Sequence, residues 1–108
     1  MKSKNVSIEY SRDLDSKEQF YYLGFNKYGV PFHAMNATLH YPEIGNAVCL
    51  VSYNTPAAFV DNVDGLHFIY YIKSTPTTEK QITTFFSEMG LELPAAKRKK
   101  PNEWIQIE

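Results

Sequence analysis

The sequence predicts an α+β fold in which an antiparallel sheet of about five strands carries one helix, at about residues 76–89, on one face. Several segments of strand length are rich in apolar residues and are separated by Gly, Asn, Asp and Pro turn signals. A single segment instead repeats apolar residues with helical spacing. The 108 residues are long enough for one globular domain, 1–108, with a core rich in the eight Tyr and seven Phe of the chain.

The N-terminal part is expected to supply two strands. Residues 6–10 alternate apolar and polar side chains, which is the period of a half-buried strand. Residues 20–25 form a strongly aromatic run, which favours a strand covered on both faces. The alternative for this run is a helix, because Asp15 or Ser16 could serve as its N-cap.

A returning strand and a central strand are predicted next. Residues 26–29 are typical of a turn, after which residues 30–35 would return as the hairpin partner of 20–25. Pro31 lacks the N–H that a ladder needs, so this strand is expected at an edge of the sheet. Residues 47–53 form a nearly continuous apolar run, which is typical of a central strand.

A second hairpin is predicted around residues 61–65, which hold the strongest turn signal of the chain. Residues 57–60 lead into it and residues 66–73 lead out of it. Because side chains alternate along a strand, one face of 66–73 meets the core and the other is amphipathic.

The one expected helix follows this hairpin. Ser74 or Thr75 can cap it, and Pro76 suits its first position because the φ angle of proline is already helical. Gly90 supplies the C-terminal stop. The apolar stripe has the i, i+3, i+4, i+7 spacing of a helix that lies on a sheet, and it consists of Ile82, Phe85, Phe86 and Met89.

The chain ends in a basic segment and a short strand. Residues 104–107 alternate like a strand that docks at an edge of the sheet. Residues 95–103 are expected to be solvated, and they concentrate positive charge in an otherwise mildly acidic chain of net charge −1. Four of the eleven basic residues lie there, namely Lys97, Arg98, Lys99 and Lys100.

Nucleic acid is the less favoured partner. The basic residues outside residues 97–100 are too few to cover a face of the fold with positive charge. The alternative is that the basic segment contacts phosphates while Trp104 stacks on a base. The favoured interpretation is a solvated segment with Trp104 packed against the body.

No pattern in the sequence indicates catalysis, a cofactor or a metal. The chain has neither a Gly-x-Ser-x-Gly elbow nor a glycine-rich phosphate loop. Its carboxylate pairs fall in a polar loop and beside a turn, where Asp serves local hydrogen bonding. The potential nitrogen and sulfur ligands have no metal-site spacing, and an enzyme would need them to converge in space. They are His33, His40, His67 and Cys49.

Contact with a protein is therefore the leading expectation. Adjacent tyrosines of a strand point to opposite faces, so Tyr22 and Tyr71 are candidates to face outward, and exposed tyrosine is a favoured anchor in interfaces. An edge strand that is open for pairing would also allow self-association or strand addition by a partner. The candidate surface thus comprises Tyr22, Tyr71, Lys97, Arg98, Lys99, Lys100 and Trp104.

Residues 35–90 resemble small uncharacterised proteins encoded by bacteriophages and mobile elements of Gram-positive bacteria. The resemblance rests on a strand with Tyr53-Asn54-Thr55-Pro56, a hairpin, and the helix start Ser74-Thr75-Pro76-Thr77-Thr78. It implies an accessory protein that binds a host protein, and it brings no activity or catalytic residue.

The expected location is the cytoplasm, in the host if the protein is phage-encoded. The single cysteine, Cys49, cannot form a disulfide within the chain, so the sequence is not a disulfide-stapled secreted scaffold. No apolar run approaches the ~18 residues that a membrane span needs, so no membrane contact is expected.

Overall fold

A computed structural model gives the structure of residues 10, 13–33 and 36–107. The α+β class and the antiparallel sheet are confirmed, although within these residues the sheet has six strands rather than about five and two α-helices accompany it rather than one. The strand predicted at residues 6–10 falls, except for Tyr10, outside the described residues. The strands are β1 (Val30–Pro31), β2 (Ala37–His40), β3 (Val48–Ser52), β4 (Thr55–Val63), β5 (Leu66–Tyr71) and β6 (Ile105–Ile107).

The sheet follows the chain, with the order β1-β2-β3-β4-β5-β6 and every neighbouring pair antiparallel. The predicted central strand is confirmed, since β3 lies between β2 and β4. The turn predicted at residues 61–65 is confirmed at Asp64 and Gly65, whose φ angles of 53° and 83° are those that tight hairpin turns require, whereas residues 61–63 belong to β4. The final strand is also confirmed, because β6 pairs with β5 at the sheet edge.

Helix α2 (Pro76–Glu88) confirms the predicted helix. Thr75 is its N-cap, and the Thr75 hydroxyl accepts a hydrogen bond from the backbone N–H of Thr78. Gly90 follows the helix with a φ angle of 85°, which a glycine adopts without steric cost. The apolar stripe packs on the sheet, with Ile82, Phe85 and Phe86 fully inaccessible and Met89 partly buried.

Helix α1 (Ser16–Tyr22) replaces the strand predicted at residues 20–25, which was wrong. Asp15 caps the helix and accepts from the backbone N–H of Glu18, whose carboxylate accepts from the backbone N–H of Asp15 in return. This capping box outweighs the weak helix propensity of the aromatic residues, which the helix buries on the sheet through Phe20.

The hairpin predicted between residues 20–25 and 30–35 does not form. Strand β1 is only two residues long and pairs with β2 instead, with Val30 opposite Leu39. The edge position predicted from Pro31 is confirmed, since β1 is the first strand of the sheet.

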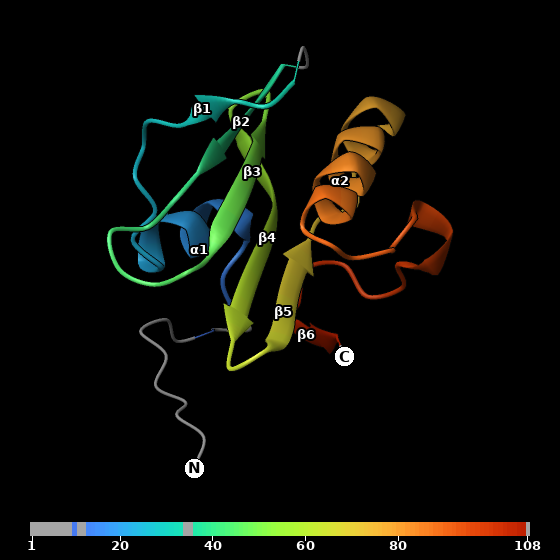
Figure 1. The fold of residues 1–108 in the computed structure, drawn as a ribbon. Helices are drawn as coiled ribbons and strands as arrows, with labels where there is room; N and C mark the ends of the chain where they lie inside the picture. The colour runs from blue at the N-terminus through green and yellow to red at the C-terminus, as the bar shows by residue number, and fades with distance from the viewer. Residues whose placement is uncertain (1–9, 11–12, 34–35, 108) are drawn as a thin grey trace.

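The two helices cover opposite faces of the sheet (Figure 1). Neighbouring positions of the central strands therefore serve two different cores. Leu50, Ala58 and Tyr71 lie in one row of the register and belong to the core beneath α2. The next row contains Cys49, Phe59 and Tyr70, which belong to the core beneath α1.

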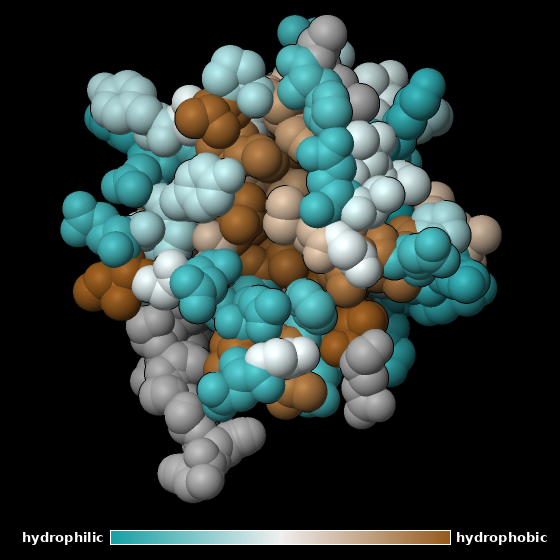
Figure 2. All heavy atoms as spheres, in the orientation of Figure 1, coloured by the Kyte–Doolittle hydropathy of each residue, from teal (hydrophilic) through white to brown (hydrophobic). Residues whose placement is uncertain are grey.

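Helix α2 does not cover its face completely. Figure 2 shows apolar side chains at the surface in the middle of the view, and Leu39 and Val48 of the α2 layer are only partly buried.

No helix of the described part of the chain is long and apolar enough to cross a membrane.

Candidate functional site

An open groove lies on the face of the sheet that carries α1. Its floor includes Thr38, Val51 and Pro56, which are in register across β2, β3 and β4. One part of its wall comes from α1 and another from the loop at residues 27–29 that precedes β1. The volume is about 440 Å³, which lies within the range of ligand sites. The wall residues are Lys17, Phe20, Tyr21, Lys27, Tyr28 and Gly29, together with His40 and Asn54.

A second hollow of about 550 Å³ adjoins this groove. The two share Thr38, Val51 and Asn54, and the second extends toward Pro31 of the edge strand and Tyr53 of the β3–β4 turn. The hollows together form a continuous depression from α1 to the edge of the sheet. We call this depression the tyrosine groove.

Three tyrosines around the tyrosine groove are highly exposed. The exposed fractions are 76% for Tyr21, 81% for Tyr28 and 56% for Tyr53. A tyrosine has a large apolar ring and a hydroxyl that forms hydrogen bonds, so exposed rings around a hollow are suited to contact with a partner. Sequence reasoning missed this cluster, because its members come from a helix, a loop and a turn that meet only in the folded chain.

The loop that carries Tyr28 is fixed to β2 by hydrogen bonds. The backbone N–H and the side-chain amide of Asn26 both donate to the carbonyl of Tyr41, at 2.9 Å each. His40 Nδ1 lies 2.8 Å from the carbonyl of Asn26, which can only accept, so Nδ1 carries the proton. In the neutral ring Nε2 then accepts from the Thr38 hydroxyl, at 2.8 Å. The loop is therefore held in place although its side chains are exposed.

Gly29 allows the closest approach between this loop and the sheet. A Cβ atom at this position would lie 2.5 Å from the carbonyl oxygen of Leu39 and 2.6 Å from His40 Nε2. Both distances are well below van der Waals contact, and the first involves backbone that cannot turn aside. Only glycine fits without a shift of the loop.

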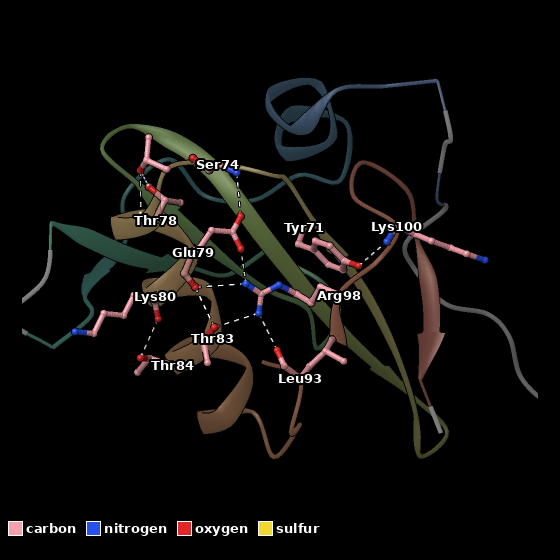
Figure 3. A network of polar contacts seen from close by, with 11 residues as sticks. Tyr71, Ser74, Thr78, Glu79, Lys80, Thr83, Thr84, Leu93, Arg98 and Lys100 are labelled. Atoms are coloured by element: carbon pink, nitrogen blue, oxygen red, sulfur yellow. Dashed lines mark hydrogen bonds and ion pairs between the residues drawn. The ribbon is translucent and has the colours of Figure 1, made fainter. Parts of the chain in front are cut away.

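The sequence suggested that the basic segment at residues 95–103 is solvated. The structure shows that part of it is buried. The 3-10 helix η1 (Ala95–Lys97) turns the chain back toward α2, and only 2% of the Arg98 side chain is exposed. Its guanidinium donates to Glu79 Oε1 at 2.5 Å and to the carbonyl of Leu93 at 2.7 Å (Figure 3). The Arg98 side chain is engaged in this internal ion pair, whereas Lys97, Lys99 and Lys100 are exposed.

Tyr71 is buried, with 3% of its surface exposed, and does not face outward as predicted. The alternation along β5 is present, but α1 and α2 cover the two faces, so Tyr70 and Tyr71 are both inside. The Tyr71 hydroxyl accepts from the backbone N–H of Lys100, and its ring lies 5.7 Å from the Arg98 guanidinium carbon. Tyr22, by contrast, is 53% exposed, on α1.

Trp104 packs against the body, as the favoured interpretation of the sequence predicted. Its ring stacks on Tyr10 at 4.2 Å between centroids and lies 5.9 Å from Phe59. The indole N–H donates to the side-chain oxygen of Gln19 on α1, at 3.3 Å. These contacts leave the indole poorly placed to stack on a nucleic-acid base.

The three histidines have three different sets of partners. His33 pairs with Glu88, His40 with Thr38 and Asn26, and His67 lies beside Asn62. Among the residues that the structure describes, no group of three His, Cys, Asp or Glu side chains could hold a metal ion. Of the three, His40 is part of the tyrosine groove.

Cys49 and Asp61 are among the buried groups whose pKa values are shifted. Cys49 is fully buried, as expected for a small core residue, and burial raises the pKa of its thiol well above the ordinary value. Burial also raises the pKa of the Asp61 carboxyl, although hydrogen bonds from the Tyr10 hydroxyl and the backbone of Asn62 oppose the shift. Neither group lines the tyrosine groove.

Comparisons with protein-family models, with curated proteins and with solved structures find no match for this chain. Function is therefore inferred from the geometry of the chain itself.

Proposed function

We propose that this protein is a small binding module that contacts another protein through the tyrosine groove. The observation that carries the proposal is the meeting of Tyr21, Tyr28 and Tyr53 around an open depression with a partly apolar floor. Tyrosine buries a large area at a low entropy cost, which makes it the commonest anchor of adaptable binding surfaces. The hydrogen bonds of Asn26 and His40 support the proposal further, because a surface already held in shape loses less entropy on binding.

A second route to a protein partner is pairing at a sheet edge. In the described part of the chain the edges are β1 and β6, each at most three residues long, and Pro31 removes a donor from β1. Short, blunted edges offer few ladder hydrogen bonds. Side-chain contact through the tyrosine groove is therefore the form of protein binding that we favour.

The biological setting is part of the same proposal. The resemblance at residues 53–60 and 74–85 supports a phage or mobile-element accessory protein that acts on a host protein in the cytoplasm. A small module fits this role, since binding alone can block a host factor.

Quantitative affinity purification from lysate of a Gram-positive host tests the proposal. The bait is compared with its Tyr21→Ala/Tyr28→Ala variant and with Tyr22→Ala, which removes an exposed ring of the same helix outside the tyrosine groove. We expect a protein that the wild type and Tyr22→Ala retain and that the double variant loses, followed by direct binding of that protein once purified. Equal recovery by all three baits would contradict the proposal.

A further inference from the structure

The charged residues that line the tyrosine groove all carry the same sign. Lys17 comes from α1 and Lys27 from the loop before β1, and among the residues that the structure describes no Asp or Glu belongs to either lining. This local excess of positive charge contrasts with a chain whose formal net charge is −1. A hollow lined by one sign of charge attracts ligands of the other sign.

Both lysines start from anchored backbone. Lys27 directly follows Asn26, whose backbone and side chain are tied to Tyr41 and His40. Its Nζ atom lies 5.4 Å from the centre of the Tyr28 ring, which is within the range of a cation–π contact. Lys17 lies in the first turn of α1, which the capping box of Asp15 and Glu18 closes. The backbone positions of the two lysines are therefore fixed before any partner arrives, and the Lys27 ammonium has a ring contact of its own.

The lining beside the lysines is partly apolar, although Thr38, His40 and Asn54 add polar groups to it. The floor contributes Val51 and Pro56, the helix contributes Phe20, and the exposed rings of Tyr21 and Tyr28 complete the wall. A ligand that combines negative charge with an apolar or aromatic group would match both the lysines and the apolar part of the lining. A peptide in which an apolar side chain is flanked by carboxylates has this composition.

We propose that the tyrosine groove binds an acidic peptide segment of the partner. Carboxylates of the segment pair with Lys17 and Lys27, and an apolar side chain between them rests on Val51 and Pro56 beside the tyrosine rings. This inference rests on the proposed function and adds the chemical class of the partner segment to it.

Selection from a displayed library of random linear peptides tests the inference. The wild-type protein is immobilised and the selected sequences are compared with the input library. Parallel selections use Lys17→Glu/Lys27→Glu and a control with the same charge change outside the groove, Lys99→Glu/Lys100→Glu. Thermal unfolding of each variant shows that it is folded, and a synthetic version of the most enriched peptide is titrated by fluorescence anisotropy.

We expect enrichment of Asp and Glu on the wild type and on the control. The synthetic peptide should bind Lys17→Glu/Lys27→Glu at least about tenfold more weakly, because two attractions become repulsions, while the control changes its Kd by less than about twofold. The affinity for the wild type should fall as salt is added.

Three outcomes would overturn the inference. Peptides that show no acidic enrichment but still need Tyr21 and Tyr28 would remove the acidic partner and leave the proposed function standing. A single-stranded oligonucleotide that displaces the peptide and depends on both lysines would assign the groove to nucleic acid. Failure to enrich any peptide would contradict a peptide site, while the affinity purification would still decide the proposed function.

Discussion

Arg98 should be the most important charged residue for stability, although it lies in a segment that resembles a solvated basic tail. Replacing Arg98 with Ala removes the donors to Glu79 Oε1 and to the carbonyl of Leu93. It also removes the contact between the guanidinium and the ring of Tyr71. The chain from η1 to β6 would then lose its main polar attachment to α2.

The cost follows from the burial of the pair. Breaking a buried ion pair by removing one partner costs about 3–5 kcal/mol, because the other charge stays behind unpaired. The side chain of Glu79 is 24% exposed and keeps a hydrogen bond from the backbone N–H of Ser74, so water and protein partly compensate. We therefore expect the lower end, about 3 kcal/mol, which lowers the Tm of a domain of this size by about 12 °C or more.

Urea unfolding followed by tryptophan fluorescence measures this loss. The single tryptophan, Trp104, packs between Tyr10 and Phe59, so its emission reports on the same end of the fold. The matched control is Lys99→Ala, an exposed residue of the same segment, which should change the free energy of unfolding by less than about 0.5 kcal/mol. Arg98→Lys keeps the charge without the planar fork and should fall between the two.

Equal stability of the Arg98→Ala and Lys99→Ala variants would refute the reasoning. It would mean that the guanidinium is solvated, as the sequence alone suggested. If Arg98→Ala is destabilised but Arg98→Lys is as stable as the wild type, the charge alone matters and the forked geometry does not.

Three further results are expected. Because the folded-state pKa of Asp61 is raised above 3.8, the free energy of unfolding should fall as pH rises from that value through the raised pKa. The Asp61→Asn variant should not show this fall, and thermal unfolding at pH 7 should find it more stable than the wild type. A variant with the same pH profile as the wild type would contradict the role of Asp61. The Cys49 thiol should react with a thiol reagent at the rate of unfolding, so rapid native-state labelling would contradict its burial. Gly29→Ala should displace the loop before β1, seen as amide shifts centred on His40, and unchanged spectra would contradict the close contact.

Local signals in the sequence predicted the elements whose structure is decided locally. The cap at Thr75, the apolar stripe and Gly90 together delimit α2. The turn at Asp64 and Gly65 needs positive φ angles, which Asp and Gly adopt readily. Each of these features involves residues close together in the chain, so no knowledge of the fold was needed.

Helix α1 shows where composition misleads. The aromatic residues after Gln19 have the composition of a strand, but Asp15 and Glu18 carry the capping-box spacing of a helix start. The sequence thus contained the correct signal, which the strand propensity of Phe20 and its neighbours outweighed in the prediction.

The groove and the buried arginine depend on contacts between distant segments. Glu79 and Arg98 are separated by 19 residues, and they meet only because η1 folds back onto α2. The groove likewise requires α1, so the incorrect strand at residues 20–25 concealed it. Neither feature has a spacing in the sequence that could reveal it.

The ladder in which each strand pairs with the strands next to it in the chain has a consequence for how the protein is made. Every hairpin closes over a short loop except β5–β6, so most of the native pairings have low contact order and can form early. The strand that completes the sheet, β6, leaves the ribosome after α2 and after Arg98. Most of the sheet can therefore form while the chain is still being synthesised. The pairing of β6 and the packing of Trp104 then come last.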